Sequence, residues 1–126
     1  MARILVIDDS PTVVLSVSRL LGGDGHQVET VTNMLELPRY LRETRPDLIL
    51  LDLEMPGLSG IGWAGFMRRC HQGKLSVIIH SAQPWKKMEE ASREVDAVGI
   101  IPKGASEDAT RCIINSALRR VARVLG

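Results

Sequence analysis

Short, continuous apolar runs alternate along the chain with longer segments in which apolar residues recur every three or four positions. The short runs predict β-strands at residues 4–7, 27–31, 47–51, 75–79 and 97–101. The longer segments predict helices at 11–21, 33–44, 61–71, 84–94 and 107–125. Apolar strands that alternate with amphipathic helices are typical of a parallel sheet covered on both faces. We therefore expect an α/β fold, a doubly wound five-stranded parallel sheet flanked by five helices.

Prolines and glycines mark several of these boundaries. Ser10 is a candidate N-cap with Pro11 at the first helical position, and Gly22 and Gly23 are expected to end that helix. Pro38 lies inside the second predicted helix, where a backbone N–H would normally be needed. We therefore expect the second helix to begin late or to bend.

Length and composition indicate one globular domain, residues 1–126, with 44% hydrophobic and 25% charged residues. Cys70 and Cys112 have no His or Cys at ligand spacing, which predicts reduced, buried or half-buried thiols. No apolar run approaches the length of a membrane span and no signal peptide is evident, so we expect a cytoplasmic protein with no membrane contact. His26, His71 and His80 share no metal-ligand spacing.

Charge excludes one class of partner and locates a candidate site. The net charge is +1 and no basic stripe with interleaved aromatic residues occurs, so direct nucleic-acid binding is not expected. Residues 1–63 carry five basic and nine acidic groups, whereas residues 64–126 carry eleven basic and six acidic groups. This asymmetry predicts an acidic site built early in the chain. The last helix carries arginines that we interpret as its solvated face: Arg111, Arg119, Arg120 and Arg123.

Polar residues follow the predicted strands: Asp8 and Asp9 the first, Asp52 the third, Ser81 the fourth and Lys103 the fifth. In an open parallel sheet the functional crevice lies beyond the carboxyl ends of the strands. Three carboxylates meeting there repel one another, so they either take up protons or hold a cation, and Mg²⁺ is the simpler solution at neutral pH. A carboxylate beside Mg²⁺ can act as a nucleophile toward phosphorus. An ammonium group and a hydroxyl could stabilise the transferred oxygens.

An ordered set of these residues resembles the bacterial response-regulator receiver domain over essentially the whole chain. The set is Asp8-Asp9, Asp52 followed by Leu-Glu-Met-Pro, then Gly60, Ser81-Ala82 and Lys103. The resemblance implies a flavodoxin-like sheet with strand order 2-1-3-4-5. It also implies that a histidine kinase or phosphotransfer protein phosphorylates Asp52.

The same resemblance implies a role for each site residue. Asp9, Asp52 and the backbone carbonyl of Glu54 would hold Mg²⁺, and Asp8 would assist through water. Ser81 would bind the phosphoryl group and Lys103 would pair with it. The resemblance places kinetic tuning of hydrolysis at Glu54 and Gln83, although both are equally well read as plain surface residues.

Two positions depart from the family pattern. Gly104 follows Lys103 where the family usually has proline after a cis bond, and a cis bond before a non-proline residue costs about 2.5 to 4 kcal/mol. Ile100 stands where the family has an aromatic switch residue. The expected output surface therefore carries Trp85 and Ile100, with Trp85 either a partner contact or an accidental surface residue.

The preferred interpretation is a phosphorylation-controlled signalling domain that acts through protein contacts, as a stand-alone receiver or as part of a longer regulator with an output domain. The alternative is a pseudo-receiver that binds proteins without phosphorylation. A third hypothesis is an aspartyl-phosphate phosphohydrolase. That class favours Asp-x-Asp, whereas this chain has Asp52-Leu-Glu54 and no cap domain. We therefore expect no enzyme activity on an external substrate.

Overall fold

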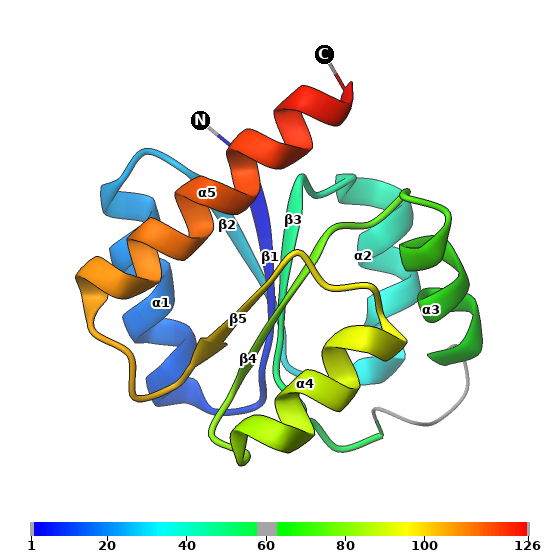
Figure 1. Cartoon of the computed structure of the whole chain (residues 1–126), viewed down its shortest axis with the longest axis horizontal. Coiled ribbons are helices and arrows are strands. Elements are labelled where there is room, and N and C mark those ends of the chain that lie inside the picture. The colour runs from blue at the N-terminus through cyan, green and yellow to red at the C-terminus, as the bar shows by residue number, and fades with distance from the viewer. Residues whose placement is uncertain (1, 58–62, 126) are drawn as a thin grey trace.

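A five-stranded parallel sheet forms the centre of the molecule, with strand order β2-β1-β3-β4-β5. The computed structural model describes residues 2–57 and 63–125 (Figure 1). The strands are β1 (Arg3–Ile7), β2 (Gln27–Val31), β3 (Leu48–Leu51), β4 (Val77–Ser81) and β5 (Gly99–Pro102). The expected fold class and strand order are confirmed.

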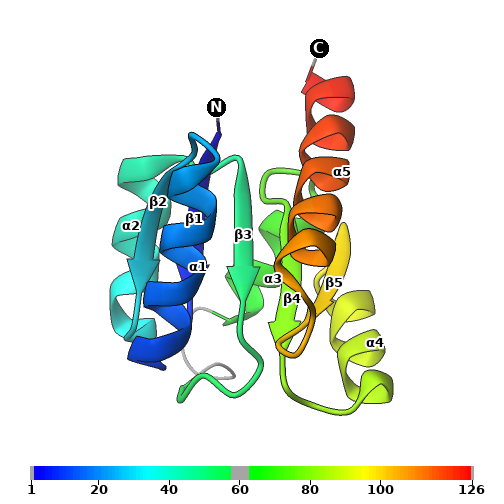
Figure 2. The same cartoon turned by 90° about the vertical axis from the view of Figure 1, so that its left-hand side faces the viewer.

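Helices cover both faces of the sheet, as Figure 1 and Figure 2 show. One face packs against α1 (Pro11–Gly23) and α5 (Glu107–Leu125), and the other against α2 (Leu37–Thr44), α3 (Trp63–His71) and α4 (Trp85–Glu94). Two apolar clusters fill these layers. Strand residues alternate between them: Ile4 and Val6 of β1 pack on the α1/α5 side, whereas Leu5 and Ile7 pack on the other. Every second side chain of a strand points to the same face, which explains this alternation.

The ends of α1 and α2 follow their local chemistry. Ser10 caps α1, its Oγ accepting a hydrogen bond from the Val13 N–H at 3.4 Å. The prediction that Gly22 and Gly23 end α1 at residue 21 is wrong by two residues, because the backbone N–H of Asp24 continues the helical hydrogen bonding. The late start expected near Pro38 is confirmed: a 3₁₀ turn, η1 (Met34–Glu36), precedes α2.

Two further expectations need correction. The fourth strand is residues 77–81, not 75–79, because Val77 pairs with Ile49 of β3 and the ladder with β5 runs on to Ser81. Cys112 is exposed on α5, although Cys70 is buried as expected. None of the described helices is both long and apolar enough to cross a membrane.

Arg111 is not simply part of a solvated helix face. Its guanidinium donates from Nε to both carboxylate oxygens of Asp24, at 3.2 and 2.9 Å. This bond ties the first turns of α5 to the loop between α1 and β2. A residue-by-residue helix pattern could not show it, because the two residues are 87 positions apart in the chain.

Candidate functional site

Three carboxylates converge at the carboxyl edge of the sheet. Asp8 and Asp9 follow β1, and Asp52 follows β3. One oxygen from each of the three lies within 4.8 Å of the others. Asp8 and Asp52 are 1% and 2% exposed, whereas Asp9 is exposed. The expected convergence is therefore confirmed, with two of the acids in the protein interior and one at its surface.

Lys103, directly after β5, supplies the opposite charge. Its Nζ lies 3.0 Å from Oδ2 of Asp8 and 3.4 Å from Oδ2 of Asp52. The hydrogen bond from the Lys103 N–H to the Ser81 carbonyl, 2.9 Å long, fixes this residue beside the end of β4. One lysine thus faces two buried carboxylates, and the site as described has an excess of negative charge.

Burial and charge shift the proton affinities of this site. Burial raises the pKa of Asp52, and the Asp8 carboxylate adds to that effect; the Glu54 N–H and Lys103 oppose it. Burial alone lowers the pKa of Lys103, but the neighbouring Asp8 and Asp52 outweigh it and the net shift is upward. The lysine therefore stays protonated, while Asp52 is held less readily as the anion than an exposed aspartate.

The same short hydrogen-bonded turn follows three of the strands. In each turn a side-chain oxygen accepts from the backbone N–H two residues later. The pairs are Asp8 Oδ1 with Ser10 N (2.9 Å), Asp52 Oδ1 with Glu54 N (3.1 Å) and Ser81 Oγ with Gln83 N (3.1 Å). Each turn therefore ties one side-chain oxygen to the backbone. The second carboxylate oxygens of Asp8 and Asp52, both Oδ2, lie near the Lys103 ammonium.

Glu54 and Gln83 meet across the site. The amide Nε2 of Gln83 donates to Oε1 of Glu54 at 3.5 Å, joining the loop after β3 to the loop after β4. Sequence reasoning placed both residues near the site without predicting this contact. Since the two residues are 29 positions apart and lie in loops, no periodic pattern could have predicted it.

The donor set fits a hard divalent cation. Carboxylate oxygens are the ligands that Mg²⁺ prefers. Oδ2 of Asp8 is buried and lies 3.0 Å from the Lys103 ammonium. One lysine cannot neutralise three clustered carboxylates, and the remaining negative charge costs free energy that a bound cation would offset.

Sequence reasoning considered His80 only as a metal ligand and did not predict its burial beside the site. This histidine precedes Ser81 on β4, is 6% exposed, and has its pKa lowered to about 4 by burial and by the charge of Lys103, with Asp8 opposing. A titratable residue inside an otherwise apolar strand was the signal that could have identified it.

The two departures from the family pattern lie on β5 and just after it. No cis peptide bond occurs in the described residues, so the bond between Lys103 and Gly104 is trans. Ile100 is half-buried and packs against the α2/α3/α4 side of the core. Trp85, at the start of α4, is 53% exposed as expected.

Comparison with known proteins identifies a family. A family model for the response regulator receiver domain matches residues 4–115. Protein-glutamate methylesterase/protein-glutamine glutaminase 1 of Anaeromyxobacter dehalogenans is 36% identical over 120 residues, which cover 89% of this chain and 34% of that protein. Protein PilH of Pseudomonas aeruginosa is 43% identical over 60 residues, which cover 48% of this chain and 50% of PilH. The matched parts thus span half or less of these relatives.

Solved structures agree with this match. The response regulator receiver domain protein from Clostridium thermocellum is similar with a TM-score of 0.81 and 25% identity, covering 100% of both chains. The response regulator receiver protein from Burkholderia phymatum has a TM-score of 0.79 and 26% identity, covering 94% of this chain and 95% of that one. Likeness over nearly whole chains extends the sequence match to the complete fold.

Proposed function

Because this chain belongs to the response regulator receiver domain family of two-component signalling, we propose that it accepts a phosphoryl group on Asp52 and that phosphorylation switches its contacts with other proteins. The observation that carries the proposal is the setting of Asp52. It is 2% exposed, ends a central strand, and lies 3.4 Å from the Lys103 ammonium beside two further carboxylates. A carboxylate placed among cation-binding groups is suited to phosphoryl transfer.

The reaction is a displacement at phosphorus. A carboxylate oxygen of Asp52 attacks the phosphorus of a phosphohistidine, and an O–P bond forms as the N–P bond breaks. The leaving imidazole nitrogen keeps the electron pair, and the product on Asp52 is an acyl phosphate. Hydrolysis of that bond by water returns the carboxylate and releases phosphate.

Two side chains stabilise the transferred group. Lys103 carries a full positive charge within reach of the Asp52 oxygens and would neutralise one phosphoryl oxygen. Ser81 Oγ already accepts a hydrogen bond from Gln83, so its own O–H remains available to donate to another oxygen. The contact of Gln83 with Glu54 lies over the same crevice, where the pair would tune the access of water.

Mg²⁺ would be held by carboxylate oxygens of Asp9 and Asp52 and by the backbone carbonyl of Glu54, with Asp8 assisting through water. When bound, it supplies charge neutralisation for the phosphoryl oxygens. The grouping of the three acids around a single lysine supports this assignment.

The partners follow from this chemistry. A sensor histidine kinase or a phosphotransfer protein would donate the phosphoryl group in the cytoplasm. The recipient of the signal would be a separate protein or an output domain of a longer chain, and Trp85 and Ile100 would lie on the surface it contacts. No direct nucleic-acid binding and no reaction with an external substrate is proposed.

A pseudo-receiver that binds partners without phosphate is the second candidate. The residues that favour it are Ile100 in place of an aromatic residue and Gly104 after Lys103. Both positions depart from the family pattern, whereas the acids and the lysine that phosphorylation needs are all present.

Intact mass spectrometry after incubation with Mg²⁺ and acetyl phosphate separates the two candidates. We expect one added phosphoryl group, labile to base, which Asp52→Asn abolishes. Asp108→Asn is the matched control, because Asp108 is 98% exposed on α5. An unmodified mass under conditions that phosphorylate a known receiver would favour the pseudo-receiver.

A further inference from the structure

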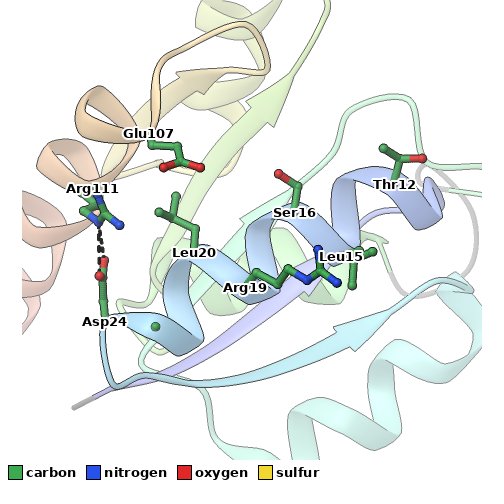
Figure 3. Close-up of a pocket in the computed structure, with 9 residues that line it drawn as sticks. Thr12, Leu15, Ser16, Arg19, Leu20, Asp24, Glu107 and Arg111 are labelled. Atoms are coloured by element: carbon green, nitrogen blue, oxygen red, sulfur yellow. Dashed lines mark hydrogen bonds and ion pairs between the residues drawn. The ribbon is translucent and has the colours of Figure 1, made fainter.

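A pocket lies at the amino edge of the sheet, at the opposite end of the strands from Asp52. The segments that lead into β3, β4 and β5 line it through Asp47, Ser76 and Val98, and α5 contributes Arg120. Its volume is about 390 Å³, and small-molecule sites have volumes of about 300 to 1,000 Å³. This amino-edge pocket is separate from the groove between α1 and α5 that Figure 3 shows, and the proposed phosphorylation uses none of its residues.

The most buried part of the lining is apolar. Cys70 and Leu75 are 3% and 6% exposed, and Val98 is half-buried. Burial raises the pKa of the Cys70 thiol to about 11, with Arg69 opposing this shift and Asp96 adding to it, so the thiol is uncharged at neutral pH. This part of the pocket therefore favours an apolar group.

The exposed part of the lining carries charges of both signs. Lys74, Arg120 and Asp96 are exposed, and none of the three forms an ion pair with another residue of the described chain. Asp47 is already engaged, because its Oδ2 accepts a hydrogen bond from the backbone N–H of Arg3 at 2.8 Å. Two bases and one acid are thus left to pair with a ligand.

Backbone hydrogen bonds hold the walls of the pocket in place. The Ser76 carbonyl accepts from the Ile49 N–H at 2.8 Å, and the Val98 N–H donates to the Val77 carbonyl at 2.8 Å. Both bonds join a lining segment to a neighbouring strand. A ligand would therefore enter a pocket that is already formed, and little ordering of the chain would oppose its binding.

The distribution of charge indicates what kind of ligand fits. A purely anionic ligand would pair with Lys74 or Arg120 but would be repelled by Asp96, and a purely cationic ligand would be repelled by the two bases. A molecule that carries both charges beside an apolar body can pair with all three groups and fill the apolar part of the pocket. Free apolar amino acids have this chemistry.

We propose that the amino-edge pocket binds a free apolar amino acid. The carboxylate of the ligand pairs with Arg120 and Lys74, its ammonium group pairs with Asp96, and its side chain contacts Cys70 and Leu75. The inference goes beyond the proposed phosphorylation and does not depend on it. Because the charged groups are exposed, we expect weak, reversible binding.

NMR titration of the full chain with three related probes tests this proposal. L-Tryptophan carries both charges, indole-3-propionate lacks the ammonium group, and tryptamine lacks the carboxylate. We expect L-tryptophan to cause saturable shifts of the amide signals of residues 74–76 and 96–98, and to bind more tightly than either analogue. The same spectra show whether each variant is folded.

Two variants should separate the two charges of the ligand. Arg120→Gln should weaken binding of L-tryptophan and indole-3-propionate about threefold and leave tryptamine unchanged. Asp96→Asn should weaken L-tryptophan and tryptamine by a similar factor and leave indole-3-propionate unchanged. Asparagine tolerates the left-handed backbone of Asp96, which has φ 51°, so this substitution introduces no strain.

Lys86→Gln and Asp108→Asn are the matched controls, because they remove the same charges at exposed positions of α4 and α5 outside the pocket. They should leave all three affinities unchanged. The proposal is overturned if L-tryptophan causes no saturable shift, or if the shifts cluster outside the amino-edge pocket. It is also overturned if the three probes bind equally, or if the control variants weaken binding as much as the pocket variants do.

Discussion

Lys103 lies closer to Asp8 than to Asp52: its Nζ is 3.0 Å from Oδ2 of Asp8 and 3.4 Å from Oδ2 of Asp52. The lysine therefore bridges two carboxylates that are almost fully buried. In the unphosphorylated protein its positive charge offsets the free-energy cost of burying these two carboxylates. A phosphoryl group on Asp52 would compete with Asp8 for the same ammonium, so phosphorylation and the stability of the site are coupled through one side chain.

Lys103→Met should destabilise the protein. It leaves the buried Asp8 and Asp52 without their cation, and removing one partner of a buried ion pair costs about 3 to 5 kcal/mol. Because Lys103 is 17% exposed, we expect the lower part of that range, measured as the free energy of unfolding in urea. Lys87→Met, at an exposed position of α4, is the control. Adding Asp52→Asn to Lys103→Met should recover part of the loss, and a double variant no more stable than Lys103→Met would contradict the pairing.

Asp52→Asn should stabilise the metal-free protein at neutral pH. Burial raises the pKa of Asp52 above its ordinary value of 3.8, so the folded state holds this proton over a pH range in which the unfolded state has lost it. Stability therefore falls as pH rises through that range and stays lower above it. Asparagine does not ionise, so the variant does not lose this stability at neutral pH.

Urea unfolding of the parent and the variant, at neutral pH and below pH 3.8, tests the direction of this pH dependence. Asp52→Asn should have a larger free energy of unfolding than the parent at neutral pH, and this difference should shrink below pH 3.8. An advantage that is the same at both pH values would show that Asp52 titration is not its cause.

The sequence predicts the site better than it predicts the contacts within it. Strand ends place Asp8, Asp52 and Lys103 at one edge because all parallel strands point the same way. Strand order, however, came from family resemblance, since periodicity does not say which strands are neighbours. The position of β4 was shifted by two residues because Leu75, in the loop before β4, is buried and therefore resembles a strand residue.

Long-range polar contacts could not be predicted from the sequence, for a different reason. The bonds between Gln83 and Glu54, and between Arg111 and Asp24, depend on how loops and helix ends are placed in space. Arg111 also lies 3.6 Å from Asp108, three residues earlier on α5, but that local spacing gives no sign of the bond to Asp24. Such contacts follow from the tertiary fold and leave no pattern along the chain.

Asp9→Ala should weaken Mg²⁺ binding more than Asp8→Ala does, because Asp9 is the proposed direct ligand and Asp8 acts through water. Removing one of three clustered anions also relieves repulsion, so the metal-free variant should be somewhat more stable. The gain should be small, since Asp9 is exposed and water screens its charge.

Isothermal titration with Mg²⁺ and thermal unfolding without it provide the two measurements. Asp108→Asn serves as the control for loss of a surface carboxylate. An Mg²⁺ affinity unchanged in Asp9→Ala would exclude this residue as a direct ligand.

His80→Leu should make the protein more resistant to acid. Burial, assisted by Lys103, lowers the pKa of His80 to about 4, so the unfolded state binds a proton below pH 6.5 that the folded state refuses. Stability is therefore lost as pH falls from 6.5 toward 4, by up to about 3 kcal/mol for a shift of this size. Urea unfolding across this range should show a flatter pH dependence for His80→Leu.

Trp85 should report phosphorylation, and the signal should reach it through Ser81. Ser81 is fully buried at the end of β4, and its Oγ accepts from the N–H of Gln83, two residues before Trp85. Donation from Ser81 to a phosphoryl oxygen would draw its Oγ toward that group, and the Gln83 N–H bonded to this Oγ would follow, together with the start of α4. Pro84 stiffens the intervening chain, so the displacement is passed on to Trp85, which is 53% exposed and free to change its environment.

Binding of beryllofluoride, a phosphoryl mimic, should therefore change the emission or quenching of Trp85 in a Trp63→Phe background. Ser81→Ala should suppress this change. Ile100→Ala should preserve most of it, because a branched aliphatic side chain packed against the core has no ring to swing between buried and exposed positions. If Ile100→Ala erased the response while phosphorylation of Asp52 stayed intact, β5 would be the transmitting element, and the path through Ser81 would be wrong.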